Sequence, residues 1–171
     1  MELTYYTDYA LRVLMFVGLR QEEPCRISEI AKHYGISENH LMKVVHGLAQ
    51  GRFLRTYRGK GGGLTLAKDP KDIVIGAVVR RMEGPFKPVE CFRTGNECVI
   101  TNVCALPSVL DEAFQAFIAV LDRYTLADLV NRRTRLASRL FGSARSQRRD
   151  VRKKPPLSES RTQKTVGLTS A

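Results

Sequence analysis

The sequence predicts a mostly α-helical fold with one small β-hairpin, arranged as a winged helix-turn-helix domain followed by a long dimerisation helix. Three observations support this fold class. Apolar residues recur at helical spacing through much of the first 130 residues. Gly35 separates two short helical segments and suits a left-handed turn. A Gly-rich turn over 58–63 joins two short segments that alternate like strands.

The helix-turn-helix is predicted from three helical segments near the N-terminus. A first helix is expected over residues 3–19, where apolar side chains return every three or four positions. A short second helix, with Ser28 as its expected N-cap, ends at Gly35. The third helix is expected to begin after an N-cap at Ser37 and to end at Gly51.

Downstream of the hairpin the sequence predicts three more helices. The first runs from Asp72 or nearby to about Glu83. The second, over 106–123, has an apolar stripe wider than a small winged-helix body needs. We therefore expect it to pair with a second copy in a homodimer, with packing against its own domain as the alternative. The last helix is expected from Leu126 to about Leu140.

These elements divide the chain into four segments. Residues 1–83 are expected to form a winged helix-turn-helix domain of the DNA-binding kind, and residues 84–105 to form a loop that carries three cysteines. Residues 106–141 contain the dimerisation helix and a C-terminal helix. Residues 142–171 form a basic tail that is poor in apolar residues and rich in Arg, Ser and Pro, so we expect it to be disordered.

The formal net charge of +11 is concentrated at the C-terminal end of the chain. Residues 131–171 hold 12 Lys/Arg against 2 Asp/Glu, whereas residues 1–130 hold 16 against 15. Overall basicity is therefore weak evidence for nucleic-acid binding by the folded part. Residues 39–68 are better evidence, because they contain six Lys/Arg and no acidic residue, which suits phosphates. A solvated charged face is the alternative interpretation.

The sequence argues against a membrane, secreted or catalytic protein. No apolar run reaches bilayer-spanning length, and the N-terminus lacks the pattern of a signal peptide. The cysteine pattern is not that of a disulfide framework. We therefore expect a soluble cytoplasmic protein with no membrane partner. No paired carboxylates or nucleophile–base arrangement indicate an enzyme, and GKGGG lacks the Ser/Thr and following helix of a phosphate loop.

The start of the third helix is expected to enter the major groove of double-stranded DNA. Asn and His side chains can read base edges there, and Lys can contact a phosphate or a guanine. Five residues lie off the apolar stripe and are the predicted contacts: Ser37, Asn39, His40, Lys43 and His46. At the hairpin tip, Arg58 and Lys60 are expected to reach an adjacent minor groove or the DNA backbone. His33 is expected to be a plain surface residue.

Three of the four cysteines lie in the segment CFRTGNECVITNVC, with the spacing C-x6-C-x5-C. Cys91, Cys98 and Cys104 can therefore converge on one centre at low entropic cost, and thiolates bind soft metals and iron–sulfur clusters. Structural zinc sites favour C-x2-C pairs, which are absent here, and the wide gaps suit a bulkier cluster. The spacing alone leaves zinc and iron–sulfur open. The remote Cys25 is expected to be a half-buried spare thiol.

Five segments together resemble the Rrf-type family of iron–sulfur winged-helix repressors. They are YTDYALRVL at 6–14, ISENHLMKVVHGL at 36–48, RGKGGGLTLAK at 58–68, the three-cysteine loop and YTLADLV at 124–130. The resemblance implies a homodimer on a palindromic operator. It also implies one iron–sulfur cluster per protomer, with Cys91, Cys98 and Cys104 as ligands. We expect a 4Fe–4S cluster rather than a 2Fe–2S cluster. Asp8 matches the acidic residue that completes the site from the other subunit, although a carboxylate there also suits the helix dipole.

Within this family, NHLMKVV and YTLADLV look most like the nitric-oxide-sensing members. The resemblance then implies a switch, in which cluster loss on reaction with nitric oxide frees the loop and releases DNA. Members of the IscR type place a histidine where Pro107 stands here, and the x6 gap is longer than expected for the nitric-oxide sensors. An iron- or redox-responsive regulator of the RirA or IscR type is the alternative. So is a zinc- or thiol-based DNA-binding protein without a cluster.

Overall fold

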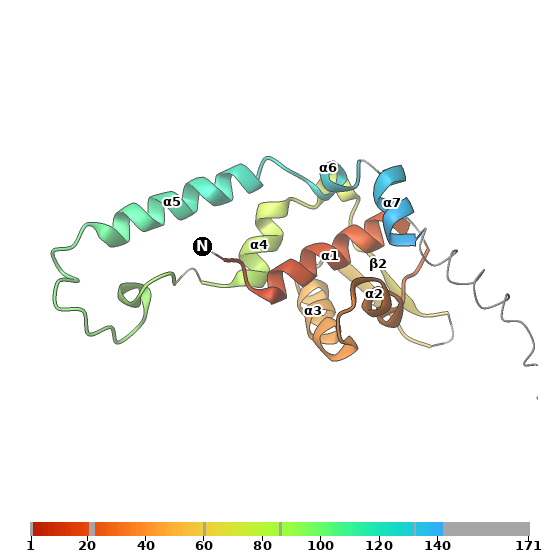
Figure 1. The fold of residues 1–171 in the computed structure, drawn as a ribbon, viewed down its shortest axis with the longest axis horizontal. Helices are drawn as coiled ribbons and strands as arrows, with labels where there is room; N and C mark the ends of the chain where they lie inside the picture. The colour runs from red at the N-terminus through yellow and green to blue at the C-terminus, as the bar shows by residue number, and fades with distance from the viewer. Residues whose placement is uncertain (1, 21–22, 60, 86, 132, 142–171) are drawn as a thin grey trace, which may run out of the picture.

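The computed structural model describes residues 2–20, 23–59, 61–85, 87–131 and 133–141, with only the backbone for 133–135. The described residues form seven α-helices, a two-stranded antiparallel hairpin and two short 3-10 turns (Figure 1), which confirms the predicted fold class. The elements are α1 (Tyr5–Arg20), α2 (Ile27–Tyr34), α3 (Glu38–Gln50), β1 (Leu54–Tyr57), β2 (Gly63–Leu66), η1 (Pro70–Asp72), α4 (Ile75–Glu83), η2 (Glu90–Phe92), α5 (Leu106–Leu121), α6 (Leu126–Val130) and α7 (Arg133–Phe141).

Helices α2 and α3 form the predicted helix-turn-helix. Gly35 ends α2 with a φ of 66°, and the Ser37 hydroxyl accepts the His40 N–H at 3.3 Å to cap α3. The prediction that Ser28 caps α2 is wrong, because the cap is Arg26. The Arg26 N–H donates to the Glu29 carboxylate at 3.1 Å, so the acidic residue in the first turn satisfies the helix start.

The hairpin packs against the segment that contains Cys25. Its strands pair from Leu54 with Leu66 to Tyr57 with Gly63. Cys25 adds a bridge to Leu64, with N–H to oxygen distances of 3.0 and 2.8 Å. Cys25 is therefore fully buried rather than half-buried, and burial raises the pKa of its thiol to about 11. A thiol that stays protonated at neutral pH is a poor metal ligand.

The core is built around α1, which is contacted by α3, α4, α6 and β2. Phe16 and Leu14 of α1 are fully buried together with Leu41 and Leu48 of α3 and Ile73 before α4. Burying each such side chain contributes about 1.5–3 kcal/mol, so these contacts fix the recognition helix to the rest of the body.

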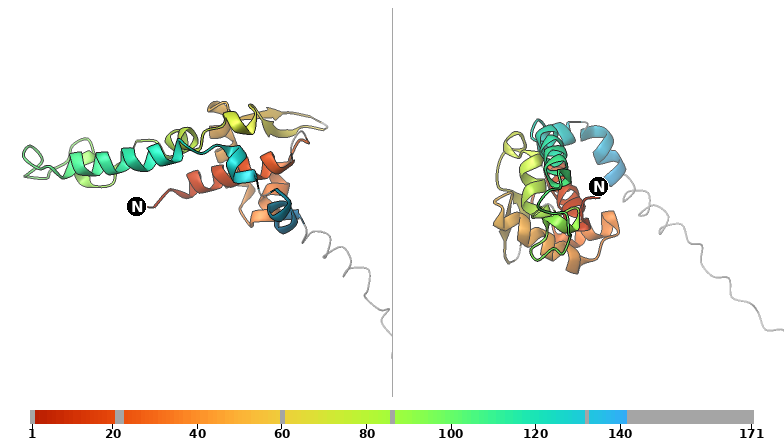
Figure 2. Two further views of the ribbon diagram at one scale, coloured as in Figure 1. Left: turned by 90° about the horizontal axis from the view of Figure 1, so that it is seen from above. Right: turned by 90° about the vertical axis from the view of Figure 1, so that its left-hand side faces the viewer.

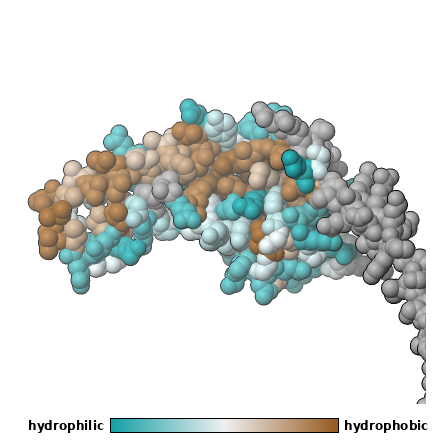
Figure 3. All heavy atoms as spheres, in the orientation of Figure 1, coloured by the Kyte–Doolittle hydropathy of each residue, from teal (hydrophilic) through white to brown (hydrophobic). Residues whose placement is uncertain are grey.

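Helix α5 is joined to the body at one end only and extends away from it (Figures 1 and 2). The Ile75 N–H donates to the Tyr124 carbonyl at 2.9 Å, and Arg80 makes two 2.8 Å hydrogen bonds to Asp122. Ile118 is the one residue of α5 that is buried. Figure 3 shows a hydrophobic surface that runs along this end of the molecule.

The prediction of one helix from Leu126 to about Leu140 is wrong, because the chain forms α6 and α7 instead. Leu126 lies directly over Gly18 of α1, while the Phe141 ring lies 5.1 Å from the Phe16 ring. A straight helix would separate Leu126 from Phe141 by about 22 Å, so it could not bring both against the same turn of α1.

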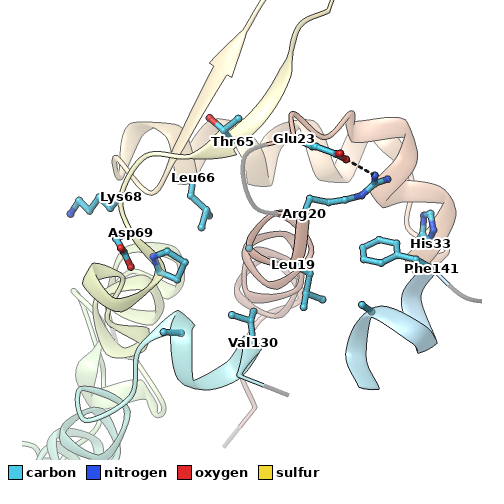
Figure 4. A pocket seen from close by; sticks show the side chains of 14 residues that line it. Leu19, Arg20, Glu23, His33, Thr65, Leu66, Lys68, Asp69, Val130 and Phe141 are labelled. Atoms are coloured by element: carbon cyan, nitrogen blue, oxygen red, sulfur yellow. Dashed lines mark ion pairs between the residues drawn. The ribbon is translucent and has the colours of Figure 1, made fainter. Parts of the chain in front are cut away.

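Phe141 and His33 lie next to each other at one side of a cleft that is lined by α1, α2, β2, α6 and α7 (Figure 4). The His33 ring is half-buried and lies edge-on to Phe16 at 5.3 Å and to Phe141 at 5.6 Å. The prediction of a plain surface residue at His33 is therefore wrong, because α7 covers it. No cysteine is among the described residues that line this cleft.

Candidate DNA interface and cysteine site

The exposed side of α3 carries all five residues predicted to read DNA. Leu41, Val44 and Leu48 face the core, which leaves the opposite side of the helix to solvent. The exposed residues on that side are Ser37, Asn39, His40, Lys43 and His46. Their side chains are therefore accessible to base edges and phosphates, and the Ser37 hydroxyl also accepts the His40 N–H. Met42, which is 51% exposed, also lies on this helix and was not predicted; an apolar side chain can contact a thymine methyl group.

The hairpin tip presents a basic residue in a tight turn. Arg58 is exposed, and Gly59 and Gly61 have φ values of 93° and 89°, which side chains disfavour. Lys60, the second predicted contact of the tip, lies outside the described residues. The tail over 142–171 also lies outside them.

The cysteine loop is folded into turns by its own hydrogen bonds. The Glu97 N–H donates to the Glu90 carboxylate at 3.1 Å. Glu97 directly precedes Cys98 and Glu90 directly precedes Cys91. The hydrogen bond therefore brings the backbone before one cysteine close to the residue before the other. The Thr101 hydroxyl lies 2.8 Å from the Cys98 carbonyl and orders the segment that follows.

The three loop cysteines are half-buried and none is in a disulfide. The Cys104 sulfur accepts the Leu106 N–H at 3.4 Å, where α5 begins. The thiolate is the form of cysteine that binds metal. Three thiols in 14 residues are a suitable donor set for an iron–sulfur cluster.

The single chain does not bring a full ligand set together. Within the described ranges, no three His, Cys, Asp or Glu side chains stand close enough to share a metal ion. The apolar residues Val99 and Val103 are 98% and 86% exposed in the same loop. Side chains of this kind are normally covered, so the loop has the composition of a surface that meets another molecule.

Asp8 lies in the first turn of α1 and is held by Arg12. The Arg12 Nε donates to Asp8 Oδ1 at 3.0 Å, and a second guanidinium nitrogen lies 2.7 Å from Oδ2. Both side chains are 40% exposed, so the pair is accessible. A carboxylate has about four lone-pair sites, and two of them stay available to a further ligand.

The first turn of α1 is also tied to the start of the cysteine loop. The Glu83 carboxylate accepts the Thr4 N–H, the Thr4 hydroxyl at 2.9 Å and the Thr7 hydroxyl at 2.5 Å. Glu83 is the last residue of α4, and the loop begins at the next residue. Sequence reasoning missed this cluster, because its partners lie 76 to 79 residues apart.

Comparison with known proteins shows the family to which this chain belongs. The family model Rrf2, described as an iron-dependent transcriptional regulator, matches residues 3–132. The chain belongs to the Rrf2 family. It is a DNA-binding transcriptional regulator of mostly helical winged-helix fold, as the resemblance predicted.

Curated relatives of this Rrf2 protein share about half of its aligned residues. The transcriptional regulator NsrR of Geobacillus kaustophilus is 54% identical over 142 residues, which cover 82% of this chain and 97% of the relative. NsrR of Bacillus subtilis is 54% identical over 132 residues, which cover 76% and 90%.

Solved structures show the same fold. The structure of CymR, the global cysteine regulator of B. subtilis, matches with a TM-score of 0.61 at 26% identity and covers 77% of this chain and 97% of its own. IscR of T. potens matches with a TM-score of 0.62 at 25% identity and covers 77% and 87%. Among the helices of the described residues, none has the length and apolarity to cross a membrane.

Proposed function

We propose that this Rrf2 protein is a dimeric repressor that holds a palindromic operator while its cysteine loops hold iron–sulfur clusters, and that nitric oxide ends this binding. The observation that carries the proposal is the loop itself. Three half-buried thiols, free of disulfides, lie between the end of α4 and the start of α5. The NsrR relatives and the iron-dependent description of the family support the same reading.

The homodimer is supported by α5. This helix leaves its apolar residues Leu106, Val109 and Val120 between 44% and 58% exposed. Pairing with a second α5 would bury these side chains at about 25 cal/mol for each Å² removed from water. A two-fold dimer also presents two α3 helices to two half-sites, about 34 Å or one DNA turn apart.

Cys91, Cys98 and Cys104 would hold the cluster, one per protomer, and Asp8 of the partner subunit would complete it. A 4Fe–4S cluster is the form we favour over 2Fe–2S. When bound, such a cluster supplies iron that nitric oxide can ligate in competition with protein groups. A carboxylate oxygen is a weaker ligand for iron than a thiolate, so Asp8 is the exchangeable ligand of the set.

The protein's own residues convert ligand loss into DNA release. While the thiolates are held, the loop is fixed at the end of α4 and the start of α5. While Asp8 is held, α1 of the partner subunit is fixed to the same loop. The spacing of the two α3 helices is then set for the operator, and freeing Asp8 and the thiolates shifts the population toward dimers with other spacings.

At the DNA, the roles follow from side-chain chemistry. Asn39 and His40 would meet base edges in the major groove, with Ser37 and His46 beside them. Lys43 would contact a phosphate or a guanine, and Arg58 would reach an adjacent minor groove or the backbone.

A repressor that responds to iron rather than nitric oxide is the second candidate. The iron-dependent description of the family favours it, and it would use the same three thiolates. The two candidates differ in the signal alone, so a direct comparison of the two signals separates them.

The test starts from protein purified without oxygen. We expect a brown protein with about four iron and four sulfide per protomer, which binds a duplex selected from a random pool. Nitric oxide should release this duplex at a few molecules per cluster, whereas an Fe²⁺ chelator under the same conditions should not. Release by the chelator alone would favour the iron-responsive candidate. A colourless protein that contains zinc would overturn the cluster.

Two cysteine variants serve as a matched pair for this test. Cys98→Ala should lose the iron and the response to nitric oxide. Cys25→Ser should keep the iron, because Cys25 is buried in the body beside the hairpin and is not a ligand.

A further inference from the structure

Tyr6 connects the start of α1 directly to the recognition helix. Its hydroxyl donates to the backbone carbonyl of Lys43 at 3.1 Å. Lys43 lies in the middle of α3, and its side chain is on the exposed side of that helix. Tyr6 lies two residues before Asp8. The hydrogen bond therefore joins the turn that carries the proposed cluster ligand to the helix that is proposed to read DNA.

Gly47 makes this close approach possible. In an α-helix the Gly47 N–H donates to the same Lys43 carbonyl, so Tyr6 adds a second donor to one acceptor. A Cβ at Gly47 would overlap the Tyr6 hydroxyl and lie 3.1 Å from its ring carbon Cζ and 3.2 Å from Met82 Cε. Any larger residue at this position would push the tyrosine away from α3.

The same turn of α1 is held on its other side by α4. Glu83 accepts hydrogen bonds from Thr4 and Thr7, on either side of Tyr6 in the sequence. Glu83 is also the last residue before the cysteine loop. Movement of the loop's first residues, or of Asp8, therefore reaches the turn from which Tyr6 contacts α3.

We propose that Tyr6 is the positioning residue that transmits the state of the cysteine site to the recognition helix. This inference rests on the proposed function. The apolar contacts hold α1 and α3 together but are not directional, so they set the rotation of one helix against the other less strictly than a hydrogen bond does. A hydrogen bond to a backbone carbonyl is directional, so Tyr6 fixes α3 in one rotation relative to α1. When Asp8 is freed, the turn shifts, and Tyr6 carries α3 with it.

Two conservative variants test this role in the full-length protein. Tyr6→Phe removes only the hydroxyl, and Tyr5→Phe is its control, because Tyr5 is 73% exposed and precedes it on the same helix. Gly47→Ala displaces the ring from the opposite side. Gly18→Ala is its control, because a Cβ there would meet its nearest neighbour at an ordinary 3.5 Å.

The measurement is the affinity for the selected duplex, taken for cluster-loaded and for cluster-free protein. The ratio of the two affinities is the coupling between the sites. We expect Tyr6→Phe and Gly47→Ala to lower this ratio about fivefold, the usual worth of one neutral hydrogen bond, while iron content and visible spectrum stay unchanged. The affinity of the cluster-free protein should change little, and both controls should keep the wild-type ratio. A loss of stability alone would weaken both forms together and leave the ratio as it was.

Three results would overturn the inference. An unchanged ratio in Tyr6→Phe would remove Tyr6 from the coupling and leave the proposed function standing. Loss of iron from Tyr6→Phe would make the residue part of the cluster site rather than a link to α3. A wild-type ratio of one would refute the proposed function and this inference with it.

Discussion

Helices α1 and α5 have the same length and opposite surroundings. Each has 16 residues, yet α1 buries eight of them and α5 buries one. The body around α1 is folded by its own core, whereas the cysteine loop and α5, which we call the arm, expose apolar side chains along their length. The difference indicates that the helix-turn-helix belongs to a body that is stabilised by its own hydrophobic core. Under the proposed function, the arm would reach its working arrangement only with a second chain and a bound cluster.

The largest expected effect is on the stability of the body. Leu14 is fully buried in α1, so Leu14→Ala should lower the free energy of unfolding by about 2–5 kcal/mol. The matched change in the arm, Val103→Ala, should cost within about 0.5 kcal/mol, because Val103 is 86% exposed. Urea unfolding of cluster-free protein measures both, and equal costs would contradict the division into body and arm.

The next effect is on assembly. Val109 is 58% exposed on α5, and Val109→Asp would place a charge in the proposed helix pair. We expect monomers in sedimentation at micromolar concentration and operator affinity lower by about 100-fold, because two linked half-site contacts become one. Glu112→Gln, an exposed change on the same helix, is the control. A dimer that survives Val109→Asp would place the interface elsewhere.

A smaller effect is expected at the hairpin tip. Arg58→Ala should weaken operator binding about tenfold through the loss of one charge-assisted contact. Arg123→Ala, an exposed arginine on the connection between α5 and α6, should leave it unchanged. The comparison is made by fluorescence anisotropy at moderate salt, and equal affinities for wild type and Arg58→Ala would refute the contact.

The smallest effect is expected from the tail. Residues 142–171 carry eight Lys/Arg and two Asp/Glu, a net charge of +6. Their deletion should weaken binding to the operator and to an unrelated duplex alike, by about threefold. The slope of log affinity against log salt concentration should fall by about the value of one phosphate contact. The preference for the operator should stay the same. A change in that preference would mean that the tail reads sequence.

Local signals in the sequence were enough for the helix-turn-helix, the hairpin and the spacing of the three loop cysteines. The Gly35 turn, the Ser37 cap and the hairpin glycines each act within a few residues, so their chemistry can be read directly. The Arg26 cap and the break between α6 and α7 were missed, since the first depends on Glu29 reaching back and the second on where Phe141 packs.

In the candidate site, too, residues close in sequence were predicted, whereas contacts between distant residues were not. The three cysteines are close in sequence and were found from their spacing. Asp8 was named through resemblance alone, because its proposed target lies on another chain. The contact of Tyr6 with Lys43 joins residues 37 positions apart, and that of Glu83 with Thr4 joins residues 79 positions apart. No local sequence pattern predicts contacts over such separations.

The most direct test of the account is a nitric oxide titration of operator binding by wild type and Cys98→Ala, both prepared without oxygen. The account predicts that wild type binds tightly, is brown, and releases the duplex as nitric oxide is added. It predicts that Cys98→Ala is free of iron, binds weakly and does not respond. A colourless Cys98→Ala protein that binds as tightly as wild type and still responds to nitric oxide would contradict it.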